Sequence, residues 1–438
     1  MADLFDISTR IIDSGQVDTP VNRITNELSE LDDGLAIVES FSHCVALRTA
    51  EGVVCFDSSG VITGEAVVNA LRGWTDDPIS HLVYTHGHAD HVGGSRFFAA
   101  AAERDGRQRP RVIGHDNVAA RLDRYRYTSD WNVQINRRQF GGVGGTIAVG
   151  IGAGSNEGGG ALPPFLPDDT LRPDETFTDV HSMYVGGEHI ELHHARGETD
   201  DHLWAWLPDR RCIMSGDFVI WNFPNAGNPQ KVQRYPSEWA AALRAMIAQQ
   251  PEMLLPAHGL VISGRERIAT VLDDIATALE NLVSDVVAMM NGGATLDTIV
   301  HTVKVPQETL AKPYLRPLYD EPEFVVHNIW RLYGGWWDGV ASHLKPAPDA
   351  TVAVALAELA GGAEVLMRRA HQAAAAGDLR LACHLADFAG SAAPADPAIH
   401  AARAEIYQAR RKAEPSLMSK GIYQAASRES ERIANPPA

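Results

Sequence analysis

The segment that most restricts the fold of this chain is 84–95, which reads YTHGHADHVGGS. It follows a β-branched and aromatic run that predicts a strand, and it places His86, His88, Asp90 and His91 within six residues. Alternate residues at a strand end point the same way, so His86 and His88 can converge on one divalent ion. Asp90 and His91, just past the turn, can face a second ion. The segment therefore predicts a fold that carries a metal site at its strand ends.

Three more candidate ligands follow later predicted strands. Glu198 comes after a glycine in ARGETDDH, Asp217 ends the run CIMSGD, and His258 ends the run LLPAHG. One carboxylate or histidine after a glycine is usually ordinary loop chemistry. Combined with the first cluster, these three predict a site in which seven side chains hold two cations.

Short strand patterns alternate with helical patterns from about residue 34 to 260. Residues 34–49 and 52–60 predict a β-hairpin with its turn at Glu51-Gly52, and Trp204 and Trp206 alternate with small apolar residues as in a buried sheet. This alternation predicts an α/β fold with its chemistry at strand ends.

Residues 141–164 are so rich in glycine that a regular element there has a high entropic cost. We expect a loop. Two interpretations are open, a surface insertion and a mobile cover over the substrate site.

Helix-forming residues with apolar side chains at helical spacing dominate after about residue 262. The first predicted helix begins near residue 265 and stops at Asn291-Gly292-Gly293. Further helices are predicted at about 322–337, 350–377, 379–390 and 397–412. We therefore predict two domains, an α/β domain over 1–262 and an all-α domain over 263–438.

The order HGHADH, a Gly-Glu turn, Gly-Asp and AHG resembles the metallo-β-lactamase superfamily over about residues 30–262. The resemblance implies an αββα sandwich with a dinuclear metal site at its strand ends, in which Asp57 supports the site. It also implies the ligand sets: His86, His88 and Glu198 for the first ion, Asp90, His91 and His258 for the second, and Asp217 as the bridge.

Glu198 stands where most of that superfamily has a histidine, and this glutamate resembles the alkyl sulfatase branch. The stretches NVQINRRQFGG at 132–142 and EFVVHNIWRLYGGWWDG at 323–339 are similar to the same branch, the second to its helical dimerisation domain. The resemblance implies a homodimer through the helical domain, with part of the aromatic group of Trp330, Tyr333, Trp336 and Trp337 at the interface.

The function that this resemblance implies is hydrolysis of a sulfate ester of an organic alcohol by a metal-bound hydroxide. We expect two zinc ions per chain, with manganese or iron as other metals that suit a nitrogen-and-oxygen site. Asp90 and Asp217 are the expected catalytic carboxylates, since their charge keeps both ions in place. An alternative keeps the site but cleaves a carboxylic ester, lactone or thioester; it is favoured by Gly216-Asp217, where the alkyl sulfatase branch has glutamate followed by asparagine.

Candidate substrate-binding residues are fewer. Arg137 and Arg138 can offer a bidentate fork to a sulfate, and Lys231 can offer a point charge. The alternative is that these three residues are solvated surface cations that pair with the excess of acidic side chains. His115, after the strand-like run RVIG, is either a group that supports the site or an ordinary loop histidine.

Charge and cysteine usage restrict the partners. The 38 Lys and Arg residues against 56 Asp and Glu residues leave a net charge of −18, which opposes nucleic acid or anionic lipid as the main partner. We expect a small-molecule ester as the substrate. No run of apolar residues is long enough to span a bilayer, the N-terminus lacks the pattern of a signal peptide, and the four scattered cysteines predict buried thiols. We therefore expect a cytoplasmic protein without a membrane span.

Overall fold

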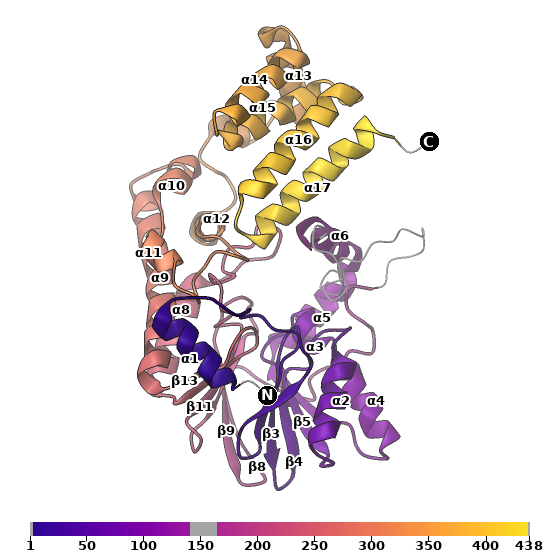
Figure 1. Ribbon diagram of the computed structural model, residues 1–438, viewed down its shortest axis with the longest axis vertical. Coiled ribbons are helices and arrows are strands. Elements are labelled where there is room, and N and C mark those ends of the chain that lie inside the picture. The colour runs from indigo at the N-terminus through magenta and orange to yellow at the C-terminus, as the bar shows by residue number, and fades with distance from the viewer. Residues whose placement is uncertain (1–2, 141–163, 437–438) are drawn as a thin grey trace.

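The computed structural model of the protein describes residues 3–140 and 164–436. Two β-sheets and their flanking helices occupy one end of the molecule, and a bundle of helices occupies the other (Figure 1). Apart from Pro164, the predicted loop over 141–164 lies outside the described residues, so both interpretations of it remain predictions.

The first sheet has seven strands that are neighbours in chain order. β3 and β4 form the predicted hairpin, with Thr49 opposite Gly52. From β4 to β7 the strands run parallel, so their carboxyl ends meet at one edge of the sheet. The strands are β1 (Leu28–Asp32), β2 (Leu35–Val38), β3 (Cys44–Thr49), β4 (Gly52–Phe56), β5 (Ile79–Val83), β6 (Arg111–His115) and β7 (Glu175–Phe177).

The second sheet has six strands in the order β13-β12-β11-β10-β9-β8. All its neighbours pair antiparallel except β11 and β12, which run parallel. The strands are β8 (Val180–Val185), β9 (Glu188–His194), β10 (Leu203–Leu207), β11 (Cys212–Gly216), β12 (Met253–Pro256) and β13 (Ile262–Ser263).

Apolar side chains from both sheets share one core, and helices cover the two outer faces. Trp204 and Trp206 are 3% and 6% exposed, so their predicted burial is confirmed. The first sheet is covered by α2 (Gly64–Trp74), α4 (Ser95–Arg104) and α5 (Asn117–Tyr127), and the second by α8 (Pro236–Ala248) and α9 (Arg265–Asn291). The predicted αββα sandwich is therefore confirmed. Among its described residues, this part also contains α1 (Leu4–Ser14), α3 (Ala89–Val92) and α6 (Ser129–Phe140).

The helical region differs from its prediction in two respects. Helices over 296–302, 307–310 and 417–434 are absent from the prediction, and one predicted helix is interrupted. We expected a single helix over 350–377, but it is interrupted at Gly361 and Gly362, whose φ angles are +94° and +125°. Only glycine adopts such angles readily, and the two resulting helices are bent by 87°. The helices are α10 (Leu296–Thr302), α11 (Gln307–Leu310), α12 (Pro322–Gly334), α13 (Asp349–Ala360), α14 (Ala363–Ala375), α15 (Leu379–Ala392), α16 (Pro397–Ala413) and α17 (Leu417–Ala434).

The helices after β13 are divided between two cores. Apolar side chains of α9, α10 and α12 continue the core of the sandwich, for example Ile268, Ile299 and Ile329. Side chains of α13 to α16 form a separate cluster that includes Met367 and Ala386. The division into 1–262 and 263–438 stays a prediction.

Two further expectations concern the thiols and the membrane. Cys44, Cys55 and Cys212 are buried and free, and Cys383 is free and half-buried. Within the described ranges, no individual helix has both the length and the apolar character to cross a bilayer; α13 and α14 meet that test only as a bent pair, by length and composition.

Helix α17 crosses α6 at very short range, which ties the helical bundle to the sandwich. A Cβ atom added at Gly421 of α17 would lie 1.6 Å from the backbone oxygen of Gln139 in α6, a distance that no side chain tolerates. In Figure 1 the lower end of α17 lies near α6 and α12. Only glycine permits this crossing.

We predict that Gly421→Ala destabilises the protein, whereas Gly73→Ala does not. Alanine in place of a helical glycine normally stabilises by roughly 0.5–1 kcal/mol. Gly73 in α2 has nothing within 4 Å of an added Cβ, so it serves as the matched control. Thermal unfolding measures both variants. An unchanged or raised Tm for Gly421→Ala would contradict the close crossing.

Candidate metal centre

The seven candidate ligands lie together in two adjoining groups. Each group has one ligand atom per residue, and within a group these atoms are all within 4.8 Å of one another. The groups are His86, His88, Glu198 and Asp217, and Asp90, His91 and His258. The structure thus brings together every residue that the sequence singled out for this purpose, from four separate parts of the chain.

Asp217 lies between the two groups. Its Oδ2 is 3.4 Å from His91 Nε2 and 3.9 Å from His86 Nε2, and its Oδ1 is 3.5 Å from His258 Nε2. Glu198 Oε1 is 3.5 Å from His88 Nδ1. Asp217 is thus within 4 Å of histidines of both groups, a position that suits a bridging ligand.

Local backbone structure explains the orientation of the first cluster. β5 ends at Val83, the chain bends at Thr85, and His88 has an extended backbone and precedes the first turn of α3. Asp90 and His91 are in that turn. The segment between β5 and α3 places His86 and His88 in one group, and the turn places Asp90 and His91 in the other.

The donor atoms suit a divalent transition metal. His91 Nε2 and Asp217 Oδ1 are buried and have no hydrogen-bond partner among the described residues. Buried polar atoms are nearly always satisfied, so such orphaned atoms need an explanation. His86 Nε2 and His88 Nδ1 face each other at 2.8 Å. Imidazole nitrogens and carboxylate oxygens that converge in this way form a donor set that fits zinc and similar cations.

Asp57 holds one histidine of the second group in place. Its Oδ2 accepts a hydrogen bond from His91 Nδ1 at 2.7 Å, and its two oxygens also accept from the backbone N–H and the hydroxyl of Thr85 at 2.8 and 2.7 Å. A metal-binding histidine typically donates its other ring N–H to a carboxylate in this way. The geometry agrees with the supporting role that the resemblance implied.

Three supporting residues were missed by the sequence analysis. Asp201 Oδ2 accepts from the N–H of Gly87 and from Arg121 Nε, both at 3.0 Å, and so fixes the backbone between His86 and His88. The only sequence signal was the pair Asp200-Asp201 next to a candidate ligand.

The third missed residue is Arg234, which is 1% exposed. Its guanidinium donates to the backbone oxygen of Glu198, and its Nη2 lies 3.3 Å from Glu198 Oε1, to which Asn225 also donates. A single arginine in a loop has no sequence pattern that predicts a contact with Glu198. The same loop contains Lys231, which the sequence analysis did single out.

Electrostatics differ between the two groups. Burial holds the pKa of His86 and His88 well below the usual range, with the charges of His91 and Arg234, respectively, as the next causes. Burial also opposes protonation of His91, but the carboxylates of Asp217 and Asp57 outweigh it and raise its pKa. His86 and His88 are therefore held in the neutral form that binds a cation, whereas a cation at His91 competes with a proton.

A cavity of about 560 Å³ opens onto five of the seven candidate ligands, namely His88, Asp90, Glu198, Asp217 and His258. Lys231 lines it and donates to Asn136 Oδ1 at 2.9 Å, and burial lowers the pKa of its ammonium to about 7. Four residues were expected to bind substrate. Of these, Lys231 alone is found among the described residues that line the cavity.

The other three lie away from the cavity wall. Arg138 is exposed and donates to Gln230, and Arg137 is half-buried on the same helix. His115 is buried, with its ring stacked 3.8 Å from that of His194 and its Nε2 3.1 Å from the backbone oxygen of Thr178. The geometry therefore favours Lys231 over these three as a substrate contact.

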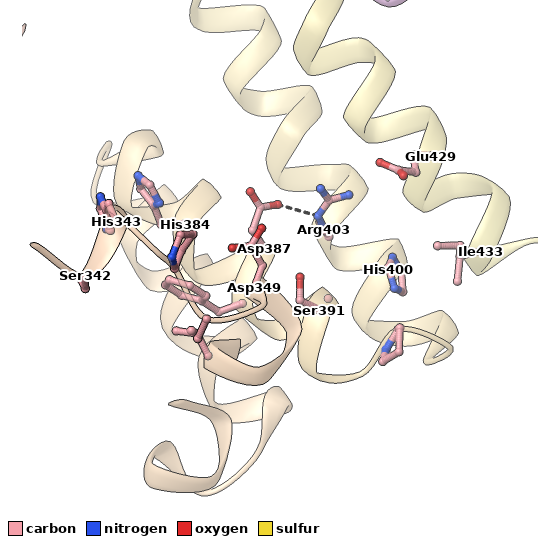
Figure 2. Close-up of a pocket in the computed structure, with 16 residues that line it drawn as sticks. Ser342, His343, Asp349, His384, Asp387, Ser391, His400, Arg403, Glu429 and Ile433 are labelled. Atoms are coloured by element: carbon pink, nitrogen blue, oxygen red, sulfur yellow. Dashed lines mark hydrogen bonds and ion pairs between the residues drawn. The ribbon is translucent and has the colours of Figure 1, made fainter. Parts of the chain in front are cut away.

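A larger cavity of about 870 Å³ lies in the helical bundle (Figure 2). α15, α16 and α17 contribute His384, Arg403 and Glu429 to its wall. The ion pair between Arg403 Nε and Asp387 Oδ1 spans 2.8 Å and compensates the charge of this arginine. None of the seven candidate ligands is among its described lining residues, so the chemistry belongs to the smaller cavity.

Two parts of the chain match known protein families. Residues 33–105 match the metallo-beta-lactamase superfamily, and residues 295–432 match the alkyl sulfatase dimerisation family. The first match contains the cluster from His86 to His91, and the second contains α10 to α16 and most of α17.

Curated relatives carry related names. A linear primary-alkylsulfatase from Pseudomonas sp. (strain ATCC 19151) is 27% identical over 356 residues, which cover 78% of this chain and 65% of the relative. An (R)-specific secondary-alkylsulfatase from Pseudomonas sp. is 24% identical, over 76% of this chain and 51% of the relative. The chain spans about half to two thirds of the length of the curated relatives that it matches.

A solved structure shares the fold. The stereoselective inverting sec-alkylsulfatase from Pseudomonas sp. superposes with a TM-score of 0.78 at 20% identity, over 94% of this chain and 66% of that chain. The sandwich and the helical region thus occur together in another protein.

We predict that Asp57→Asn weakens metal binding by roughly 10- to 100-fold, as is typical when the partner of a metal-bound histidine is lost. Asp57 has a φ of +61°, which asparagine also tolerates, so the variant changes the chemistry and not the backbone. Competition with a chromophoric chelator measures zinc affinity. Asp209→Asn, at an exposed turn position, is the control. Equal affinities of the two variants would contradict the role of Asp57.

Proposed function

We propose that this chain, which has the metallo-β-lactamase fold and resembles alkyl sulfatases in sequence and structure, is a metal-dependent hydrolase that cleaves sulfate esters of organic alcohols. The observation that carries the proposal is the convergence of seven ligand-competent side chains, five of which line one cavity. A small-molecule ester is the substrate that this cavity accommodates.

We assign two cations, with zinc as the expected metal, to the seven residues. His86, His88 and Glu198 would hold the first, Asp90, His91 and His258 would hold the second, and Asp217 would contribute its carboxylate to both. Such a pair of ions would lower the pKa of a water held at the centre and stabilise negative charge on the reacting ester.

The residues of this chain have three further roles: they retain the cations, orient a ligand and bind the substrate. Asp217 and Asp90 supply negative charge that retains two cations in a buried place. Burial raises the pKa of Glu198 to about 8, so without a cation its carboxyl is largely protonated at neutral pH; Arg234 opposes that shift and orients the carboxylate. Lys231 offers its ammonium to the sulfate group from the cavity wall.

A carboxylic ester, lactone or thioester is the alternative substrate for the same site. It is favoured by Gly216-Asp217, where the alkyl sulfatase branch has glutamate followed by asparagine.

We also propose a homodimer through the helical region. It is supported by the match to the dimerisation family and by the 69% exposure of Trp336. Sedimentation velocity measures the oligomeric state of the protein directly. A cytoplasmic location stays an expectation.

The first test of function is a substrate panel. We expect the zinc-loaded protein to hydrolyse sulfate esters, chelation to abolish turnover, and added zinc to restore it. His258→Ala should lower kcat/KM by more than about 100-fold because a ligand of the second cation is lost. His371→Ala, an exposed histidine of α14, is the control. Hydrolysis of carboxylic esters, lactones or thioesters without sulfatase activity would select the alternative.

The second test concerns Lys231. We expect Lys231→Met to raise KM for a sulfate ester by roughly 10- to 100-fold, the effect of one hydrogen bond between charged groups. A neutral carboxylic ester should be unaffected. Because only the protonated ammonium attracts sulfate, kcat/KM of the wild type should fall as the pH rises through about 7.

Lys231→Arg keeps its charge at higher pH, so this limb of the pH profile should disappear in that variant. Lys345→Met, at an exposed position, is the control for the loss of one positive charge. Equal KM values for Lys231→Met and the control would exclude Lys231 as the sulfate contact.

A further inference from the structure

The first turn of α17 is fixed to the segment Leu318–Glu321, which precedes α12. The N–H of Leu417 donates to the backbone oxygen of Leu318 at 2.8 Å. The hydroxyls of Ser416 and Ser419 both donate to the carboxylate of Glu321. These three hydrogen bonds, together with the close crossing at Gly421, hold this turn against the sandwich.

The same turn contributes to the wall of the candidate active site. Leu417 and Leu318 both line the cavity that opens onto the metal ligands. Next to them, the ring of Tyr319 is parallel to that of Phe140, with centroids 6.2 Å apart, and both residues also line the cavity. Four side chains from α6, α17 and the segment before α12 thus form one contiguous, largely apolar wall.

Charge is concentrated elsewhere around this cavity. Five metal ligands, together with Arg23, Lys231 and Arg234, carry the charged groups of the lining, and asparagines add neutral polar groups. An ester has one charged end and one organic end. If the sulfate lies against the cations and Lys231, as the proposed function requires, the organic group must occupy the apolar part of the same space.

We infer that Leu417, at the start of α17, is a specificity-determining residue that limits the length of the organic group accepted by the active site. This inference rests on the proposed function and adds to it. We choose Leu417 because the hydrogen bond from its backbone N–H to Leu318 fixes the start of α17, so the backbone that carries this side chain cannot move away from a longer substrate without loss of that contact.

Variants at this position test the inference. In Leu417→Ala the wall recedes, and kcat/KM for linear alkyl sulfates from butyl to dodecyl should shift towards the longer chains. The ratio of long- to short-chain kcat/KM should change by about tenfold, the effect of one or two methylene groups in an apolar pocket. In Leu417→Phe the wall advances, and the preference should shift towards the shorter chains. Leu381→Ala, an exposed leucine of α15 outside the cavity, is the matched control.

Binding separates this inference from the proposed function. Alkyl sulfonates of the same lengths resist hydrolysis, and calorimetric titration of the zinc-loaded protein gives their affinities without turnover. If no sulfate ester is hydrolysed but the sulfonate length profile shifts with the residue at 417, the proposed activity is wrong and the wall is upheld. If both length profiles of Leu417→Ala match those of Leu381→Ala, or if sulfonates show no dependence on length, the inference is overturned.

Discussion

Electrostatic crowding of buried ligand groups is the constraint on which the rest of the structure depends. Four histidines and three carboxylates are packed within a few ångströms, and His91 Nε2 and Asp217 Oδ1 have no hydrogen-bond partner in the described part of the chain. Such an arrangement is costly unless positive charge compensates it. Hydrogen bonds and an ion pair from the surrounding residues keep the ligand groups from moving apart. Asp57 holds His91, Asp201 holds the backbone at Gly87, and Arg234 holds Glu198.

The αββα architecture is what permits this crowding. Parallel strands in the first sheet bring Asp57 and the cluster after β5 to one edge, and the parallel pair β11 and β12 brings Asp217 and His258 to the facing edge of the second. The helical region then completes the cavity, because Leu417 and the segment before α12 supply part of its wall. Helices far along the chain are therefore part of the candidate site as well as of a second core.

Sequence reasoning succeeded where the signal was local and periodic. The hairpin at Glu51-Gly52 and the burial of Trp204 and Trp206 follow from strand alternation and turn chemistry. It failed at Gly361-Gly362, where two glycines interrupt a run of helix formers, because a glycine inside such a run can be either tolerated or used as a cap. Arg121, Asp201 and Arg234 were missed because the sequence around a charged residue, whether in helix α5 or in a loop, has no pattern that shows which distant group the residue contacts.

The sequence by itself determined which side chains can bind cations and which segments form strands and helices, because ligand chemistry and hydrophobic period are properties of short stretches. Tertiary structure alone decided that Lys231, rather than Arg137, Arg138 or His115, lines the cavity. It also decided that α17 crosses α6 at Gly421 and adds Leu417 to the wall. These contacts depend on which surfaces meet when distant segments pack. The free energy of that packing comes from the whole core, so a short stretch of sequence cannot predict the contacts.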